Sequence, residues 1–233
     1  MDISSRLMKI VEMVPVSDTV ADIGTDHGYV LIELLKRKKI RRGIASDNKA
    51  MPLEKARRNA AAENVAHLMD FRLGSGFETM KKGEANGAVI AGMGGILISE
   101  LLESAAEVIR GLDFILLQPA QNPEILRKYL YEHHYKVIEE ELVREDRRYY
   151  EYLMVKYDPT QSLRLGNHLD YVVGDLLLRK KHPILKEYLT SKITELEEIK
   201  DKIQLTSENA KRKSQEIDQK INELRGVRDG STG

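Results

Sequence analysis

Cysteine and tryptophan are both absent from this 233-residue chain. The lack of cysteine excludes disulfides, thiolate metal sites and a cysteine nucleophile, so any chemistry must use other side chains or a bound cofactor. A long apolar run is also missing, and near the N-terminus Asp2, Arg6, Lys9 and Glu12 interrupt the apolar core that a signal peptide needs. We therefore expect a protein without a membrane segment that works in the cytoplasm.

An excess of charge of either sign is lacking too. The 37 Lys and Arg residues balance 37 Asp and Glu residues, which gives a formal net charge of zero. A protein that coats nucleic acid without sequence preference is normally strongly basic, so only local clusters can hold a phosphate backbone here. His133 and His134 are adjacent but have no third ligand at a suitable spacing, and we expect no metal site.

Residues 1–158 alternate short apolar runs with amphipathic segments, which is typical of a mostly parallel sheet with helices on both faces. After a first helix that Pro15 ends, strands are expected at residues 20–23, 43–46, 69–73, 88–91, 114–117, 135–142 and 149–157. Helices are expected between them at residues 29–37, 50–63, 96–109 and 123–132.

The last two predicted strands are joined by the short polar segment 143–148, which favours an antiparallel hairpin at the sheet edge. Five βα units followed by such a hairpin are the layout of the Rossmann-like class I methyltransferases. A dinucleotide-dependent dehydrogenase normally finishes its sheet with another parallel strand. The pattern therefore predicts an α/β fold of the methyltransferase type, by analogy of fold alone.

The composition changes after Asp158, and residues 159–225 are mostly helix formers with one predicted break at residues 180–183. Seven-residue spacing predicts the seam of a helical coiled-coil domain, formed by Leu189, Leu196, Ile203, Ala210, Ile217 and Leu224, with Leu185, Ile193, Ile199 and Ile221 as partial second positions. Either one continuous helix or an antiparallel hairpin turning at residues 204–209 fits this spacing, and we favour the hairpin, capped by Thr206 or Ser207. The tail, residues 226–233, is expected to be disordered.

A glycine-containing turn follows the first predicted strand. Asp22, Gly24 and Gly28 fit the pattern Asp-x-Gly-x-x-x-Gly, in which glycines let the backbone approach a ligand and a helix N-terminus points at it. An acidic residue that binds ribose hydroxyls belongs about twenty residues further on, and Asp47 stands there. Asp26 would repel the pyrophosphate of a nicotinamide dinucleotide but suits the sulfonium and amino groups of S-adenosylmethionine. A plain strand-to-helix turn is the remaining alternative.

Two further glycine clusters end the third and fourth predicted strands. At residues 74–76 a Gly-Ser-Gly turn either lets an adenine ring approach the backbone or is an ordinary loop. At residues 92–95 three glycines favour close approach of a ligand, with Met93 as core filler or as an apolar wall beside the transferred methyl group. The residues expected to bind the cofactor are Asp22, Gly24, Asp26, Gly28, Asp47, Asn48, Gly74, Ser75, Gly92, Met93 and Gly94.

These motifs together resemble the bacterial tRNA (adenine-22 N1)-methyltransferase family, called TrmK, over essentially the whole chain. The resemblance is carried by Arg6-Leu7, residues 21–29, residues 91–95, Gln118-Pro119 with Asn122, and the helical C-terminus. It implies a Rossmann-like methyltransferase fold, S-adenosylmethionine as donor, and methylation of N1 of an adenosine in the D-arm region of tRNA. Enzymes that methylate exocyclic amines commonly carry Asn/Asp-Pro-Pro-aromatic where this chain has residues 92–95, so base recognition cannot be assigned there.

N1 of adenine has a free lone pair at neutral pH and can attack the sulfonium methyl without a covalent enzyme nucleophile. The protein must align the reactants, exclude water and relieve the positive charge that develops on the adenine. Asp26 and His27 are candidates for this contact at N6, unless Asp26 caps the next helix and His27 packs on the loop. Tyr29 stacks on the base or forms helix surface, and Asn122 binds the base edge or caps the following helix.

A target adenine within folded tRNA must be extruded, and contacts with the RNA backbone must offset that energy. The residues expected to make them are Arg6, Lys36, Arg37, Lys38, Lys39, Arg41 and Arg42. Clusters at residues 179–181 and 211–213 are weaker candidates, because charge runs are usually solvated faces.

Three readings remain open. The helical domain is an RNA grip of a tRNA methyltransferase, or it dimerises a methyltransferase for a small molecule or protein, or the chain is a non-enzymatic coiled-coil partner. A tRNA methyltransferase with a helical RNA grip is compatible with a monomer or a coiled-coil dimer.

Overall fold

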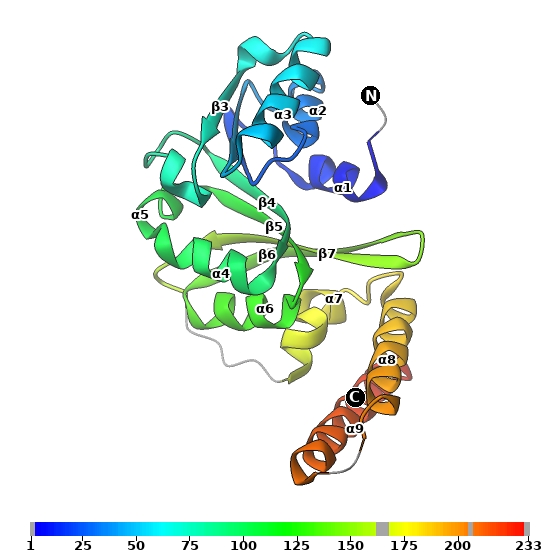
Figure 1. Ribbon diagram of the computed structural model, residues 1–233. Helices are drawn as coiled ribbons and strands as arrows, with labels where there is room; N and C mark the ends of the chain where they lie inside the picture. The colour runs from blue at the N-terminus through cyan, green and yellow to red at the C-terminus, as the bar shows by residue number, and fades with distance from the viewer. Residues whose placement is uncertain (1–2, 162–167, 205–206, 231–233) are drawn as a thin grey trace. The chain divides into compact units, whose positions relative to one another are not determined.

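The computed structural model describes residues 3–161, 168–204 and 207–230 (Figure 1). The chain divides into two compact units, Met1–Gly166 and Asn167–Gly233. The division falls after the expected boundary at residue 158, because residues that follow the last strand still belong to the first unit. Asp158 donates its N–H to the carbonyl of His134, and the carbonyl of Gln161 lies 2.9 Å from the Nδ1 atom of His134.

The first unit is built on one seven-stranded sheet with the order β3-β2-β1-β4-β5-β7-β6. Its strands are β1 (Thr19–Ile23), β2 (Arg42–Asp47), β3 (Met69–Leu73), β4 (Gly87–Gly94), β5 (Phe114–Gln121), β6 (Tyr135–Glu145) and β7 (Arg148–Tyr157). The pairs among β1 to β5 are parallel, and β7 pairs antiparallel with both β5 and β6. The predicted α/β sheet with an antiparallel hairpin at its edge is confirmed.

Several strands run further than the apolar pattern predicted. β4 includes Gly92, Met93 and Gly94, and the β4–β5 register shifts on both sides of Met93, which marks a local bulge. β6 and β7 also continue, so their connection is only Asp146 and Arg147 rather than residues 143–148. Asp146 has a left-handed φ of 55°, which is typical of a tight two-residue hairpin loop.

Helices cover both faces of this sheet (Figure 1). They are α1 (Ser5–Met13), α2 (Tyr29–Lys36), α3 (Ala50–Ala62), α4 (Gly95–Ser104), α5 (Ala106–Ile109) and α6 (Pro123–Glu132), with short 3-10 turns at Ala66–Leu68 and Gly76–Thr79. Side chains alternate between the two cores: Val89 packs with α1 to α3, and Ile90 packs with α4 to α6. The single helix expected at residues 96–109 is interrupted at Ala105, whose φ of −118° is not helical.

The second unit, described by itself, is helical. A π-helical turn (Asp170–Gly174) leads into α7 (Asp175–Arg179), and α8 (Leu185–Asp201) and α9 (Glu208–Arg228) follow. α8 and α9 form an antiparallel pair, in which Lys200 binds Asp218 and Arg225 binds Glu197. Ser207 caps α9 by accepting the N–H of Ala210. The favoured hairpin is thus observed instead of a continuous helix, and the chain breaks between α7 and α8 as predicted.

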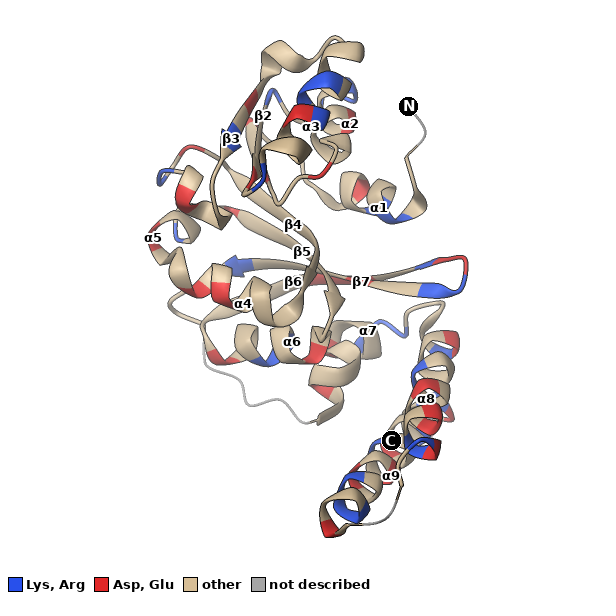
Figure 2. Ribbon diagram, viewed as in Figure 1, with Lys and Arg blue, Asp and Glu red and all other residues tan. Residues whose placement is uncertain are grey.

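The apolar seam of the helical pair is shorter than the seven-residue spacing predicted. Leu189, Ile193, Ile217, Ile221 and Leu224 are buried in it, whereas Ile199 is 41% exposed. The seven-residue repeat does not continue as a single seam from α8 into α9, because α9 runs back in the opposite direction. Lys, Arg, Asp and Glu are interspersed along both helices (Figure 2).

A disordered tail was expected at residues 226–233, but α9 continues to Arg228, so the start of that segment is helical. Arg225 and Arg228 lie in its last turn, where basic residues are favoured by the helix dipole. The last residues, 231–233, lie outside the described part of the chain. Among the helices within the described ranges, none has the length and apolar composition that a membrane span requires.

A buried ionic cluster joins α6 to the edge hairpin of the first unit. Arg127 is fully buried, and its Nε donates to Glu140 Oε1 at 2.7 Å, while its Nη2 lies 2.7 Å from Glu151 Oε2. Glu140 and Glu151 belong to β6 and β7 and are also buried. One cation thus lies between two carboxylates and links both strands of the hairpin to α6, beside the apolar contacts that Leu126 and Leu130 make in the same core.

Replacing Arg127 should therefore strongly destabilise the first unit. We expect Arg127→Met to lower the free energy of unfolding by about 3–5 kcal/mol, since two buried carboxylates lose the cation between them. Urea unfolding followed by circular dichroism measures the change. Arg37→Ala, which removes an exposed pair with Glu33, is the control and should alter it by less than about 1 kcal/mol. A loss as small as that in Arg127→Met would show that the cluster does not hold the hairpin.

Candidate active site

The carboxyl ends of the parallel strands meet at one edge of the sheet, where open α/β sheets bind their ligands. The predicted turn at residues 22–28 leaves β1 at this edge. Its amides at Gly24 and Thr25 both donate to the carbonyl of Ser46 on β2, at 2.7 and 2.9 Å. The turn is thus attached to the strand that ends in Asp47, and the structure brings the two predicted elements together.

Both glycines of the turn have left-handed backbones, with φ of 79° at Gly24 and 71° at Gly28. Such values strain residues that carry a side chain, so the backbone of the turn favours glycine at both positions. The neighbours differ from the expectation, however. A Cβ atom at Gly24 would collide with the terminal methyl of Met93, and one at Gly28 would press on Ala56 of α3. Packing within the protein therefore also accounts for these glycines.

Asp22 is a buried carboxyl at the end of β1, with only 7% of its surface exposed. Burial raises its pKa to about 6, the Thr25 side chain opposes this, and the charge of Asp47 adds to it. A nearby cation would favour its charged form. The end of β1 is therefore better suited to a positively charged ligand than to an anionic one.

Asp47 stands at the end of β2, as predicted, and is half-buried. Its Oδ1 accepts the N–H of Lys49 at 2.7 Å, and its own carbonyl accepts the N–H of Gly74 at 3.0 Å. Within the described residues its second carboxylate oxygen has no hydrogen-bond partner. Asp47 can therefore accept a ligand hydroxyl, while the neighbouring Asn48 is exposed.

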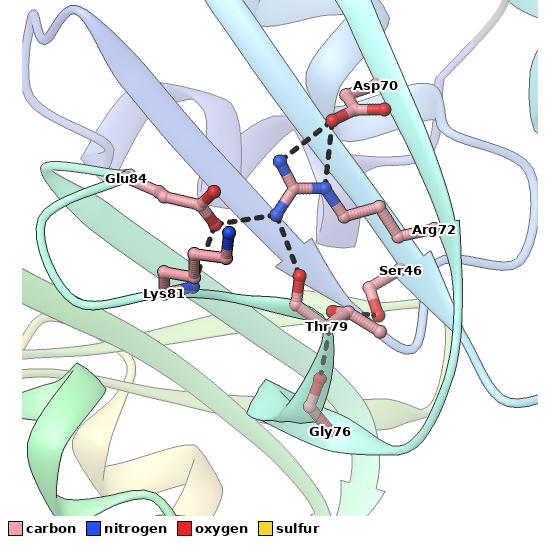
Figure 3. Close-up of polar contacts among 7 residues, drawn as sticks. All are labelled: Ser46, Asp70, Arg72, Gly76, Thr79, Lys81 and Glu84. Atoms are coloured by element: carbon pink, nitrogen blue, oxygen red, sulfur yellow. Dashed lines mark hydrogen bonds and ion pairs between the residues drawn. The ribbon is translucent and has the colours of Figure 1, made fainter.

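Arg72 organises the loop that follows β3 (Figure 3). Its guanidinium binds Asp70 and Glu84 at 2.8 and 2.6 Å, and its Nη1 donates to the Thr79 carbonyl at 2.7 Å. The Thr79 hydroxyl in turn lies 2.9 Å from the hydroxyl of Ser46. Arg72 was not among the predicted site residues, although a charged side chain within a predicted strand was a signal that could have identified it.

The glycines of that loop do not face open space. A Cβ atom at Gly74 would meet the methyl group of Thr79, and one at Gly76 would meet the side chain of Leu101. Ser75 lies between them and is exposed. The ordinary-loop alternative therefore explains both glycines, although the backbone of Gly74 remains beside Asp47.

At the end of β4 the three glycines have different surroundings. A Cβ atom at Gly95 would collide with the carbonyl oxygen of Asn122, so Gly95 is required by packing. Gly92 has a φ of 78° and is exposed, and Gly94 has no neighbouring atom within 4 Å of its missing side chain. The close approach of a ligand thus remains a reason for Gly92 and Gly94, but not for Gly95.

Asp26, His27 and Tyr29 form a cluster on the turn. His27 Nε2 lies 3.0 Å from Asp26 Oδ2, and the imidazole stacks on the ring of Tyr29 with centroids 5.0 Å apart. Asn59 of α3 holds the loop by donating to the His27 carbonyl at 3.0 Å. α2 begins after Gly28 without a side-chain cap, so the capping alternative for Asp26 is wrong. The Asp26 carboxylate is 67% exposed at the site edge.

Asn122 precedes α6 in a left-handed conformation, with φ of 52°. Asparagine tolerates this region better than most residues do. Its side chain makes no capping bond to α6, so the side-chain capping alternative is wrong here too. The side chain is half-buried, and its backbone carbonyl packs over Gly95 at the end of β4.

The predicted RNA-binding cluster at residues 36–42 lies at the opposite edge of the sheet. Arg41 and Arg42 donate their backbone N–H groups to the carbonyl of Asp18, which directly precedes β1. Lys39 Nζ binds the carbonyls of Val11 and Glu12 at 2.8 and 2.9 Å and so caps the end of α1.

Three other members of that cluster form ion pairs: Lys36 with Glu63, Arg37 with Glu33 and Arg41 with Asp18. Lys38 and Arg42 are exposed. A local helix cap and surface pairs thus account for much of the charge run, and Arg6 alone of the predicted RNA contacts reaches the carboxyl edge, beside Gly92.

Comparison with known proteins gives one consistent result. The model of the TrmK family, tRNA (adenine(22)-N(1))-methyltransferase, matches residues 20–226. A tRNA (adenine(22)-N(1))-methyltransferase from Bacillus subtilis (strain 168) is 30% identical over 224 residues, which are 95% of this chain and 92% of the relative.

Two solved structures extend the similarity to the fold. The B. subtilis m1A22 tRNA methyltransferase TrmK is 28% identical with a TM-score of 0.82, over 97% of this chain and 98% of that one. The Streptococcus pneumoniae protein Sp1610 in complex with S-adenosyl-L-methionine is 25% identical with a TM-score of 0.85, over 97% of this chain and 99% of that one.

The buried carboxyl of Asp22 should make stability depend on pH. The pKa of Asp22 is about 6 in the folded protein against 3.8 for an ordinary aspartate. Protonation of Asp22 therefore contributes its full stabilisation below pH 3.8, and this stabilisation is lost as the pH rises through 6. This difference corresponds to about 3 kcal/mol. Asp22→Asn should remove the part of the decrease in stability with rising pH that Asp22 causes. At neutral pH this variant should be more stable than the unaltered protein.

Urea unfolding at a series of pH values between about 4 and about 7 measures the profile. Asp113→Asn, which replaces an exposed aspartate near Lys156, serves as the control and should keep the shape of the unaltered curve. Parallel curves for Asp22→Asn and the unaltered protein would contradict the assignment.

Proposed function

This chain belongs to the TrmK family of tRNA (adenine(22)-N(1))-methyltransferases, and on that premise we propose which residues at the carboxyl edge of its sheet serve the donor and the acceptor. The protein is a methyltransferase that uses S-adenosylmethionine to methylate N1 of adenine 22 in tRNA. The observation that carries the assignment of the site is the turn at residues 22–28, bonded to β2 directly before Asp47.

The residues present fit the donor. Asp47 offers a free carboxylate oxygen to ribose hydroxyls, and the exposed Gly92 and the open space at Gly94 admit a ligand close to the backbone. Asp22 and Asp26 supply negative charge beside a donor whose sulfonium and amino groups are positive. Arg72 acts at a distance, by holding Thr79 and through it Ser46 next to Asp47.

When bound, S-adenosylmethionine supplies the methyl carbon: N1 of adenine forms a bond to it as the carbon–sulfur bond breaks, and the positive charge passes from sulfur to the adenine ring. No side chain has to take a proton from N1 before the attack. The protein's own contribution is alignment and electrostatic stabilisation of the adenine as it becomes positive.

Asp26 and His27 are placed for that stabilisation. The carboxylate and the imidazole are 3.0 Å apart, and both are accessible on the turn. Asp26 provides negative charge, and His27 provides a ring nitrogen that can contact the N6 amine. Tyr29 stacks on His27 and fixes the plane of its ring. Asn122 is half-buried between the end of β5 and the start of α6. We propose that its side chain contacts the edge of the target base.

The helical unit is proposed to grip the tRNA. Lys211, Arg212 and Lys213 are exposed in the first turns of α9, and the helical pair presents charged residues along its length (Figure 2). The apolar seam between α8 and α9 is satisfied within one chain, which supports a monomer over a coiled-coil dimer. We further propose that the protein acts in the cytoplasm. A small-molecule or protein acceptor and a non-enzymatic role are not favoured by the family assignment.

The activity itself has a direct test. The full chain, incubated with labelled S-adenosylmethionine and unmodified tRNA, should produce 1-methyladenosine on nucleoside mass spectrometry. The same tRNA with guanosine in place of adenosine 22 should remain unlabelled, because the acceptor atom is missing. If the guanosine-22 tRNA were labelled, or if neither tRNA were labelled, N1 of adenosine 22 would be excluded as the acceptor.

The roles of Asp26 and His27 predict separate losses of turnover. Asp26→Asn and His27→Gln should each lower kcat by on the order of 10²-fold, because each removes a group that stabilises the cationic adenine. Single-turnover methylation of tRNA measures this, and calorimetry with S-adenosylmethionine alone shows whether donor binding persists. Asp18→Asn, at the opposite edge of the sheet, is the control. If kcat were unchanged in both Asp26→Asn and His27→Gln, neither residue would stabilise the cationic adenine, and the turn would serve cofactor binding alone.

A further inference from the structure

Arg6 brings a guanidinium to the carboxyl edge of the sheet. It comes from α1, and its Nη1 donates to Gln118 Oε1 on β5 at 2.7 Å. The guanidinium carbon lies 5.6 Å from the ring centroid of Tyr150 on β7. Its Nη1 is also the nearest heavy atom to the space beside Gly92 on β4, at 3.7 Å from the position of a Cβ atom there. Arg6 thus stands over the ends of β4, β5 and β7.

The surrounding contacts fix this position. The backbone N–H of Arg6 donates to Glu145 Oε1 at 3.2 Å, and its carbonyl accepts the hydroxyl of Tyr152 at 2.9 Å. Gln118 is buried, and its amide Nε2 donates to the Pro119 carbonyl at 3.0 Å, so its oxygen points toward Arg6. The side chain is therefore preorganised, with further donor groups that Gln118 does not use.

Among the residues that the structure describes, the Arg6 guanidinium has no counter-ion: none of their carboxylates lies within ion-pair distance of it, and Glu145 accepts the backbone N–H of Arg6 instead. The reaction places further positive charge at the same edge, first on the donor sulfur and then on the adenine. A half-buried cation in such surroundings is stabilised if a substrate brings an anion to it.

The order of the sheet indicates which substrate brings that anion. Asp22 and Asp47, proposed for the donor, belong to β1 and β2, on one side of β4. Gln118 and Tyr150 belong to β5 and β7, on the other side of β4. β7 pairs with β5 over a short stretch only, and the β6–β7 hairpin extends beyond it (Figure 1). The β5 side of the carboxyl edge is therefore flanked by the hairpin. Arg6 therefore lies on the acceptor side.

We propose that Arg6 binds a phosphate of the tRNA backbone beside the target adenosine, and that Gln118 and Tyr150 are positioning residues for its guanidinium. The proposal rests on the proposed function and deepens it by naming an RNA contact at the reaction edge. Extrusion of a base exposes its flanking phosphates, and a fixed guanidinium there offsets the loss of stacking. Contact with phosphate also leaves N1 of the adenine free to react.

Arg6→Ala and Arg6→Lys test the contact. The alanine variant should raise KM for tRNA by about tenfold or more, while the dissociation constant for S-adenosylmethionine stays unchanged. The slope of log KM against log salt concentration should fall by about 1, because one phosphate contact is lost. Arg6→Lys should keep the slope and recover only part of KM, since lysine retains the charge without the planar fork.

Gln118→Glu tests the positioning role. It places a carboxylate beside Arg6, which should compete with the phosphate and raise KM for tRNA without changing donor affinity. The salt slope should fall as in Arg6→Ala. If KM and the slope stayed at their original values, Gln118 would have no positioning role. Circular dichroism melts of each variant confirm folding, and Arg6 itself attaches α1 through backbone atoms that side-chain substitution retains.

Arg110→Ala is the matched control. Arg110 also lies 5.6 Å from a tyrosine ring, that of Tyr157, but it follows α5 in the connection that leads into the start of β5, at the opposite edge of the sheet. Its loss should leave KM and the salt slope unchanged. A weaker affinity for S-adenosylmethionine in Arg6→Ala, matching the rise in KM, would assign Arg6 to the donor carboxylate and overturn the proposal.

Two failures are distinguishable. If KM and its salt slope in Arg6→Ala equalled those of the unaltered enzyme, the phosphate contact alone would be refuted. If the unaltered enzyme made no 1-methyladenosine, the proposed function would fail before any variant was compared.

Discussion

Two backbone hydrogen bonds, from the amides of Gly24 and Thr25 to the carbonyl of Ser46, determine the geometry of the site. They join the turn after β1 to β2 one residue before Asp47. The hydroxyl of Ser46 contacts Thr79, whose carbonyl is held by Arg72. The turn, the end of β2 with Asp47 and the loop after β3 are therefore one connected structure. On the proposed assignment of Asp47 to the donor, the Arg72 network supports the donor site without touching the donor.

Local sequence patterns were sufficient to predict the strands, the turn and the position of Asp47. Alternating apolar runs reflect which residues are buried, and a left-handed turn after a strand requires glycine at Gly24 and Gly28 whatever lies around it. The neighbours of the glycines were not predictable. Met93 fills the space over Gly24, and the carbonyl of Asn122 requires Gly95. These are contacts between distant segments, and a single sequence does not record which segments meet.

The basic residues show the same limit more clearly. Residues 36–42 are the densest run of basic residues before the helical unit, yet the direction of α2 places them at the edge opposite the site. Lys39 there serves as a cap for α1. Arg6 is a single charge on an amphipathic helix, and it reaches the carboxyl edge because α1 packs against the hairpin. Charge density along a chain does not record the edge of the sheet at which each charge lies.

The proposed assignments give the reaction edge an asymmetric charge. Asp22, Asp26 and Asp47 lie on the donor side of β4, and Arg6 lies on the acceptor side. A cationic donor and an anionic RNA backbone are each matched before transfer. Transfer reverses half of this arrangement, because the donor product is a neutral thioether while the adenine has become positive. Asp22 and Asp47 then lose the cation of the donor, while Asp26 faces the positive adenine that it helped to form. The methylated base also lies near the cation of Arg6, so the charges at Asp22, Asp47 and Arg6 that favour binding of the substrates also favour release of the products.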